Sequence, residues 1–236
     1  MEGEMEDEER KGDMQKYDVK AIMEKWNVRS KNKDTDQVMR PYYWVNSGKI
    51  RLEVLLRLYM SEIPLSAQDI FNKVDDISMS SASHILTKLE DKKEKFNLVK
   101  RVDSGGNRNR FFEITRRGRM IVEMIPESTF NRSFTKLFIE MGFKVSNEVI
   151  LNGKGLIYDM IATDGKSRIL IEIRKMGFSN QTINRIKDTI NNNSIQKAII
   201  ITLMRVDENT KKRLREQNIE VWDSRELDKL GRLILQ

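Results

Sequence analysis

Two carboxylic acids stand alone within apolar stretches of this chain. Asp159 lies in the segment Ile-Tyr-Asp-Met-Ile, and Glu172 lies in the segment Leu-Ile-Glu-Ile. The Asp-Gly pair at 164–165 separates the two segments and predicts a β-hairpin, so the two acids would lie on neighbouring strands. Two such carboxylates could share a divalent cation, which prefers oxygen ligands and offsets the cost of burying charge. The pattern thus has two interpretations: the metal site of a phosphodiesterase or its remnant, or solvated acids on an edge strand.

Arg174 would accompany these acids. Side chains alternate along a strand, so Glu172 and Arg174 are predicted to share one face, while Lys175 points to the other unless a bulge re-aims it. Arginine effectively never loses its proton. Arg174 could therefore stabilise an anionic transition state, but it could not serve as a base.

The order of elements over residues 130–236 extends this pattern. The chain predicts an opening helix that ends in Met141-Gly142-Phe143, a strand over 144–150, Gly155, the two acid-bearing strands, a helix over 181–192, a strand over 198–202, a helix over 208–217, a short strand over 219–223 and a last helix from Ser224. This order resembles the PD-(D/E)xK nuclease superfamily, in its Mrr-like and Holliday-junction-resolvase-like branches. Thr202 after an apolar strand is typical of the Mrr-like branch. The resemblance implies an α/β restriction-endonuclease-like domain with a mixed central sheet flanked by helices.

The resemblance also implies roles for individual residues. Asp159 and Glu172 would hold Mg²⁺ or Mn²⁺ with the Ile173 carbonyl as a third ligand, and Asp159, Glu172 and Arg174 would be the catalytic set. Two positions depart from the family. Arg174 stands where the family usually has lysine, and by spacing Asn131 stands where the family often has a glutamate; Glu127 and Glu140 fit that register less well. The sequence therefore leaves open whether the site cleaves DNA.

Residues 41–125 have a second recognisable pattern. Apolar residues at helical spacing predict a helix over 49–59, Ser66 predicts the cap of a short helix over 67–74, and Ser78 or Ser80 begins a third helix that ends near Lys92. A hairpin follows, with strands over 98–102 and 108–114, and Thr115 is expected to cap another helix. This order, with its closing Glu-Ile-Thr-Arg-Arg-Gly, resembles a winged helix-turn-helix. The expected fold is thus an α+β winged helix followed by the α/β nuclease-like domain.

The chemistry of this block suits DNA. A recognition helix presents its polar face to the major groove. Residues 95–119 hold eight Lys or Arg and two acids, and cations on a protruding hairpin neutralise phosphates. The predicted DNA-binding residues are Ser80, Ser81, Ser83, His84, Thr87 and Lys88 on the helix, with Lys100, Arg101, Asn107, Arg108 and Arg110 on the hairpin. The alternatives are a solvated charged surface or a winged helix used for protein contacts. The lone histidine receives no catalytic role.

Composition agrees with two small domains and an anionic partner. The chain has 236 residues and a formal net charge of +7, which suits two domains better than one. The expected divisions are an acidic, mostly disordered tail and linker over 1–40, a winged helix over 41–125, and the nuclease-like domain over 126–236. Six of the first nine residues are acidic, and such a block is expected to be disordered.

Several functions are excluded or disfavoured. The chain has no cysteine, which rules out disulfides, thiolate catalysis and cysteine zinc ligation. No apolar run approaches the roughly 18 residues of a membrane span, and the acidic N-terminus does not resemble a signal peptide. No Walker-type loop indicates a nucleotide cofactor. We therefore expect a cytoplasmic protein with no membrane partner.

A homodimer is expected, because two-fold DNA sites are common among both resembled classes. Three regions could supply the dimer contact: the helical segment from Leu52 to Tyr59, the segment after Gly118, or an edge of the nuclease-like sheet. The sequence does not choose among them.

These observations predict a protein that binds double-stranded or branched DNA. The first interpretation is a Mg²⁺-dependent DNA endonuclease of the Mrr or resolvase type. The alternative is a nuclease-fold regulator or architectural protein that no longer cleaves. The sequence does not indicate the DNA sequence, structure or modification that would be recognised.

Overall fold

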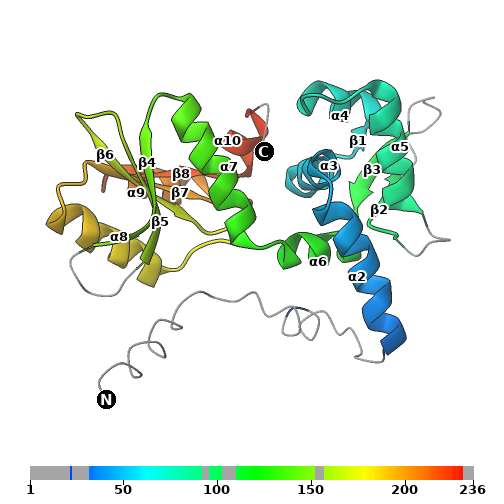
Figure 1. The fold of residues 1–236 in the computed structure, drawn as a ribbon, viewed down its shortest axis with the longest axis horizontal. Coiled ribbons are helices and arrows are strands. Elements are labelled where there is room, and N and C mark those ends of the chain that lie inside the picture. The colour runs from blue at the N-terminus through cyan, green and yellow to red at the C-terminus, as the bar shows by residue number, and fades with distance from the viewer. Residues whose placement is uncertain (1–21, 23–31, 92–95, 103–109, 152–156, 231–236) are drawn as a thin grey trace, which may run out of the picture.

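The computed structural model describes residues 22, 32–91, 96–102, 110–151 and 157–230, and it places them in two adjoining halves (Figure 1). The N-terminal half comprises α2 (Asn32–Asn46), α3 (Lys49–Met60), β1 (Leu65–Ser66), α4 (Ala67–Lys73), α5 (Met79–Glu90), β2 (Val99–Val102), β3 (Phe111–Ile114) and α6 (Arg116–Met124). Its three strands form an antiparallel sheet in the order β1-β3-β2. No helix among these described residues, or in the other half, is long and apolar enough to cross a bilayer.

Local capping signals set the helix starts in this half. The Ser66 side chain accepts a hydrogen bond from the Asp69 backbone N–H, and the Asp69 carboxylate accepts one from the Ser66 N–H, forming a capping box at α4. Ser78 caps α5 and Thr115 caps α6 in the same way, each accepting from the N–H three residues later. These caps confirm Ser66 and Thr115, and they decide for Ser78 over Ser80.

The last residues of the segment predicted as tail and linker, 32–40, are helical. Helix α2 begins at Asn32 and continues through Pro41 to Asn46. Its far end is held by packing, because Val45 is fully buried and the Trp44 ring meets the Phe96 ring edge-on at 5.2 Å. Tertiary contacts thus extend a helix through a proline that would otherwise weaken it. The predicted tail before residue 32 lies outside the described residues, apart from Ile22.

The C-terminal half is a five-stranded mixed sheet with helices on both faces. It comprises α7 (Glu127–Glu140), β4 (Lys144–Ile150), β5 (Ile157–Thr163), β6 (Arg168–Ile173), α8 (Asn180–Asn192), β7 (Lys197–Ile201), α9 (Glu208–Arg215), β8 (Ile219–Trp222) and α10 (Ser224–Asp228). The strand order is β4-β5-β6-β7-β8, antiparallel from β4 to β6 and parallel from β6 to β8. Helices α7 and α8 lie on opposite sides of the sheet (Figure 1).

The hairpin predicted at Asp164-Gly165 is confirmed. The Asp164 carboxylate accepts hydrogen bonds from the Lys166 and Ser167 backbone N–H groups, at 2.9 and 2.7 Å. Gly165 has φ +89°, a left-handed conformation that glycine adopts without strain. Because side chains alternate along β6, they enter two different hydrophobic clusters. Ile171 and Ile173 belong to the cluster on the α7 side of the sheet, and Leu170 belongs to the cluster on the α8 side.

Gly118 lies where α6 crosses the end of the loop before β2. A Cβ atom built at this position would stand 2.2 Å from the Leu98 carbonyl oxygen and 2.6 Å from Ile114 Cγ1. We expect Gly118→Ala to lower the free energy of unfolding by about 2 kcal/mol, because the blocking atom is backbone and cannot rotate away. Urea denaturation measures this, and Arg119→Ala on the exposed side of α6 is the control. Equal stabilities of the two variants would contradict the close approach.

A buried arginine joins the two halves. Arg57 on α3 is fully buried, and its guanidinium donates to carbonyl oxygens at the end of α10: those of Asp228 at 3.0 Å, Leu227 at 3.4 Å, and Leu230. Glu53, one turn earlier on α3, compensates its charge at 3.3 Å. Arg57 thus supplies hydrogen-bond donors for the carbonyls at the end of α10, of which that of Leu227 also accepts from the Leu230 N–H at 3.1 Å.

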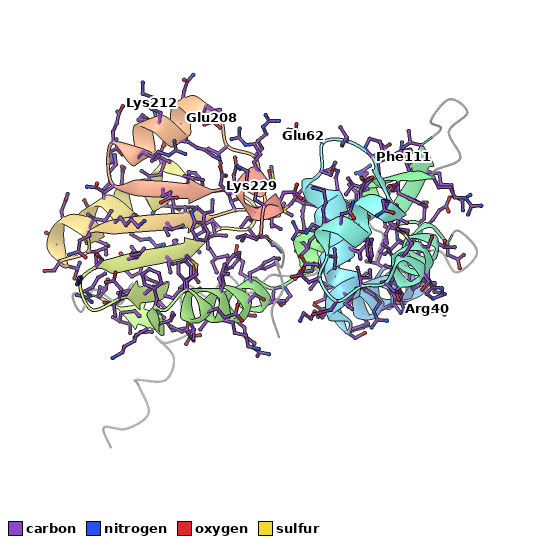
Figure 2. All side chains as sticks on the ribbon, turned by 90° about the horizontal axis from the view of Figure 1, so that it is seen from above. Arg40, Glu62, Phe111, Glu208, Lys212 and Lys229 are labelled. Atoms are coloured by element: carbon purple, nitrogen blue, oxygen red, sulfur yellow. The ribbon has the colours of Figure 1, made fainter. Side chains whose placement is uncertain are left out.

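Further contacts cross the same boundary. The Tyr59 hydroxyl approaches the sulfur atoms of Met176 and Met204, at 3.9 and 3.4 Å. Glu62 forms an ion pair with Arg205, and Figure 2 shows Glu62 facing the other half from its loop. Hydrophobic side chains of both halves, among them Leu55 and Ile171, belong to one continuous cluster. The described residues of the two halves therefore pack as one unit.

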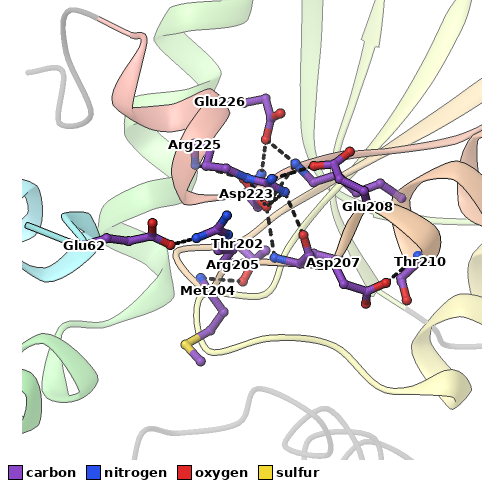
Figure 3. Close-up of polar contacts among 12 residues, drawn as sticks. Glu62, Thr202, Met204, Arg205, Asp207, Glu208, Thr210, Asp223, Arg225 and Glu226 are labelled. Atoms are coloured by element: carbon purple, nitrogen blue, oxygen red, sulfur yellow. Dashed lines mark hydrogen bonds and ion pairs between the residues drawn. The ribbon is translucent and has the colours of Figure 1, made fainter.

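Asp223 is the centre of a polar cluster that organises the C-terminal elements (Figure 3). It is fully buried, and its Oδ2 accepts from the Val206 N–H and pairs with Lys211 and Arg225, each at 2.9 Å. Burial by itself would raise the pKa of Asp223, but hydrogen bonds, led by that of Arg225, lower it well below its usual value. The cluster fixes the loop after β7 to α9 and α10.

Candidate functional site

Three carboxylates converge on the guanidinium of Arg174. Glu127 stands at the start of α7, Asp159 on β5 and Glu172 on β6. The two Nη atoms of Arg174 reach Glu172 Oε1, Asp159 Oδ2 at 3.4 Å and Glu127 Oε2 at 3.9 Å. The structure thus brings Asp159, Glu172 and Arg174 together. The structure also places a third acid beside them.

Asp159 is held by donors from both flanking elements. Its Oδ2 accepts from the Ile173 backbone N–H at 2.7 Å, and its Oδ1 accepts from the Asn131 side-chain amide at 3.1 Å. The structure therefore places Asn131 beside Asp159. The Asn131 Oδ1 atom is itself buried without a hydrogen-bond partner.

Glu172 is the deepest of the three acids. Its side chain is fully buried, and its Oε1 pairs with both Arg174 and Arg185, a residue of α8. Its second oxygen, Oε2, is buried without a partner. Such an unsatisfied carboxylate oxygen is costly, so it marks a position where a further donor or cation would be stabilised.

Glu127 connects the site to the joint between the halves. Its Oε1 accepts from the Lys175 backbone N–H at 3.1 Å, while its Oε2 faces Arg174. The Lys175 ammonium points away from the acids, as strand alternation predicts, and donates to the carbonyls at the end of α6: Val122 at 3.0 Å, Glu123 at 2.8 Å, and Ile125. Lys175 thus links α6, the last helix of the N-terminal half, to the three acids: its ammonium binds α6 and its backbone N–H binds Glu127.

Burial alters the chemistry of Lys175. Desolvation lowers its pKa from 10.5 to about 7, although Glu127 and Glu123 oppose the shift. Lys175 nevertheless cannot replace the missing family lysine by proximity alone, because its ammonium lies on the α6 side of the sheet. Arg174 keeps the position beside the acids.

A divalent cation fits this site in donor type. Asp159, Glu172 and the Ile173 carbonyl offer the oxygen ligands that Mg²⁺ and Mn²⁺ prefer, and the unpartnered Glu172 Oε2 is available to one. Arg174 already contacts these oxygen ligands, because its Nη1 also donates a hydrogen bond to the Ile173 carbonyl at 2.7 Å. Accordingly, the residues that the structure describes contain no group of three acidic or histidine side chains already arranged around a metal position.

The residues predicted to read DNA occupy one side of α5 and the adjoining hairpin. Ser80, Ser81, Ser83, His84 and Thr87 are exposed, opposite the buried Ala82, Ile85, Leu86 and Leu89, and Lys88 is half-buried. On β2, Lys100 pairs with Glu113 at 2.6 Å and Arg101 with Glu90 at 2.8 Å. Arg110 is exposed. Asn107 and Arg108 lie outside the described residues.

Two further residues of the site have no predicted role: the sequence ranked Glu127 below Asn131 by register, and it did not single out Arg185. Glu127 lies four residues before Asn131, so both are on one face of α7, and that i, i+4 relation was the available signal. Arg185 reaches Glu172 from α8, and no local pattern announces it. Its contact depends on the crossover that carries the chain from β6 to the parallel strand β7.

Comparison with known proteins agrees with the fold of this half. Residues 122–230 match a restriction endonuclease family. The search of curated proteins finds none that matches this chain.

Three solved structures have remote similarity. A protein of unknown function, AF1548, is 17% identical over 39% of this chain and 55% of its own, with a TM-score of 0.33. The protein VC1899 from Vibrio cholerae is 13% identical, over 83% and 55%, with a TM-score of 0.37. Can2 from Sulfobacillus thermosulfidooxidans, solved with cyclic tetra-adenylate, is 16% identical, over 81% and 52%, with a TM-score of 0.37.

This chain thus spans about half the length of each of these structures. The family match, by contrast, begins near the end of α6 and includes all three acids and both arginines of the site. Residues 122–230 therefore form a restriction-endonuclease-like domain.

Proposed function

We propose that this protein binds DNA and cleaves it as a Mg²⁺- or Mn²⁺-dependent endonuclease of the Mrr or resolvase type. One observation carries the proposal: Asp159 and Glu172, from neighbouring strands, contact a single guanidinium. Two carboxylates on neighbouring strands that meet at one cationic side chain could bind one metal ion in its place. The buried, unpartnered Glu172 Oε2 supports the same assignment.

Each residue has a defined part in this proposal. Asp159, Glu172 and the Ile173 carbonyl would hold the ion, which when bound lowers the pKa of a water molecule and stabilises charge on the phosphate. Asn131 orients the Asp159 carboxylate through its amide. Arg174 would release the carboxylates and donate to the phosphate, because a guanidinium suits phosphate geometry but cannot act as a base.

A second candidate function rests on Arg174 itself. Its guanidinium contacts the acids and the Ile173 carbonyl together, so a fixed cation already satisfies the donors that a metal would use. In this case the domain is a nuclease fold that no longer cleaves, and the protein is a DNA-binding regulator or architectural factor. The asparagine at 131, where the resembled family often has a glutamate, agrees with this alternative.

Cleavage assays decide between the two. The full-length protein is incubated with end-labelled duplex, four-way junction and single-stranded DNA, each with Mg²⁺, Mn²⁺ or EDTA. Metal-dependent products support the endonuclease and identify its preferred DNA structure. Binding without products in every metal condition supports the regulator.

We propose that the N-terminal half is a winged helix-turn-helix that delivers the domain to DNA. Support comes from the exposed hydroxyl-rich side of α5 and from the basic hairpin beside it. Charge reversal of Arg108 and Arg110 is expected to weaken binding to all duplex sequences. It should also reduce the salt slope by about one unit for each phosphate that the variant no longer neutralises.

Fluorescence anisotropy at several salt concentrations measures this effect. Charge reversal of Lys212 and Arg213, which are exposed on α9, gives a control with the same change of net charge in the other half. If the two double variants bind DNA alike, the hairpin does not contact phosphates.

We further propose that the protein acts as a cytoplasmic homodimer. Residues Leu52–Met60 of α3 are all buried within the chain, so this helix does not offer a dimer contact. Strand β4 stands at an edge of the five-stranded sheet and is mostly exposed, which leaves it as the preferred surface. Light scattering at micromolar concentration, with and without DNA, is expected to give twice the monomer mass; a strict monomer in both conditions would refute the dimer.

A further inference from the structure

We propose that Arg185 and Arg174 together form a phosphate-binding pair that engages a DNA phosphate group even when no metal is present. This inference rests on the proposed function for its ligand, a nucleic acid phosphate. It extends that function by assigning substrate contact to Arg185, a residue on a different element from the three acids.

The first observation is that two guanidiniums share one carboxylate oxygen. Arg174 and Arg185 both pair with Glu172 Oε1, while Asp159 and Glu127 pair with Arg174 alone. Glu172 is the one carboxylate that Arg185 contacts among the described residues. An arriving phosphate, with several strong acceptor oxygens, can therefore bind the remaining N–H donors without breaking another ion pair of Arg185.

The second observation concerns access. The side chains of Arg174 and Arg185 are 27% and 22% exposed, whereas that of Glu172 is 0% exposed. Glu172 thus lies behind both guanidiniums, and the partly exposed acids, Asp159 and Glu127, stand beside Arg174 and not beside Arg185. The buried carboxylate holds the two cations close together, where they would otherwise repel each other.

The third observation is that Arg185 is held in position. Its Cζ lies 4.9 Å from the centre of the Tyr158 ring, and the Tyr158 hydroxyl is hydrogen-bonded to Thr189 on the same helix α8. Ile186, next along the helix, is fully buried in the hydrophobic cluster on this face of the sheet. A guanidinium stacked on a fixed ring loses little further freedom when its planar fork binds phosphate.

The geometry therefore separates two tasks within one site. The acids and the Ile173 carbonyl offer oxygen atoms to a cation, while the arginines offer N–H groups to an anion. Phosphate binding by the arginines needs no metal, so it can be measured whether or not the protein cleaves DNA.

Isothermal titration calorimetry in EDTA tests the inference, with the full-length protein and thymidine 3′,5′-bisphosphate as the probe. We expect the wild type to bind, and Arg185→Met to raise the Kd by at least about tenfold, as when a charge-assisted bidentate hydrogen bond is removed. Lys187→Met removes the same charge from the same helix α8 and should stay within about twofold of the wild type.

Arg185→Lys is a second variant that should fold normally, because lysine keeps a positive charge beside the buried Glu172. It lacks the planar guanidinium, so it tests the phosphate contact separately from stability. We expect its Kd to rise at least about threefold, with an unchanged circular dichroism spectrum. Failure of the wild type to bind in EDTA, or an Arg185→Lys Kd equal to that of the wild type, would overturn the inference. Because these measurements contain no metal, they distinguish its failure from a failure of the endonuclease proposal, which is read from cleavage alone.

Discussion

Asp159→Asn and Glu172→Gln will each abolish metal-dependent cleavage, with a loss of at least about 100-fold if these residues hold the ion that activates water. They will also remove the thermal stabilisation that Mg²⁺ or Mn²⁺ gives the wild type. An ion that binds only the folded state, at about 100 times its Kd, stabilises it by about 2.7 kcal/mol. Both substitutions keep side-chain size, and DNA binding by the N-terminal half should be unchanged.

The matched control is Glu220→Gln on β8, whose carboxylate pairs with Lys197 at 3.4 Å and does not contact the site. It should keep both the cleavage and the metal-induced shift in Tm. Differential scanning fluorimetry with and without Mn²⁺ gives the shift, and nicking of supercoiled plasmid gives the activity.

Arg174→Lys separates the two candidate functions. Lysine has a smaller, mobile head group that cannot contact all the acids at once, so it frees oxygen ligands and restores a side chain whose pKa burial can lower. We expect this variant to nick DNA faster than the wild type. Three results together would remove the endonuclease proposal and leave the regulator: no metal-induced stabilisation, no cleavage by the wild type and none by Arg174→Lys.

Arg57→Met will destabilise the whole chain by about 3 to 5 kcal/mol, the usual cost of breaking a buried ion pair from one side. The methionine fills much of the space, but the buried Glu53 carboxylate loses its ion pair with Arg57 at 3.3 Å. The carbonyls of Leu227, Asp228 and Leu230 also lose the hydrogen bonds that Arg57 donates to them.

Urea denaturation followed by circular dichroism measures this destabilisation. Arg51→Met, on the same helix, is the control, because Arg51 is half-buried beside Trp44 and its hydrogen bond to Ser47 is exposed. We expect it to cost less than about 1 kcal/mol. Similar destabilisation by the two substitutions would show that the contact between α3 and α10 contributes little.

Local chemistry makes most of the fold predictable. The Ser66 and Thr115 caps, the turn at Asp164-Gly165 and the apolar strand over 198–202 each depend on residues within a few positions of one another. All of these features lie within one or two residues of their predicted bounds. The pairing of Asp159 with Glu172 is equally accessible, because one hairpin contains both acids.

Contacts between distant segments set the limit of prediction. Helix α3 has a pattern that suggests one exposed side, yet Leu52–Met60 are all buried, because α10 covers that side from the far end of the chain. Arg57 and Arg185 resemble ordinary surface cations until the fold brings them to buried partners. The proline within α2 likewise indicates a break that packing against the N-terminal half overrides.

Arg57 and Lys175 tie the two halves together from both sides, one through the end of α10 and the other through the end of α6. If the protein binds duplex DNA through α5 and cleaves it beside Arg174, as proposed above, these contacts would fix the distance between the two sites. The length of DNA between the recognised bases and the broken bond would be set by protein packing, and it would be constant from one molecule to the next. If the protein is the endonuclease proposed above, loosening it at Arg57 would spread its cuts over several neighbouring bonds.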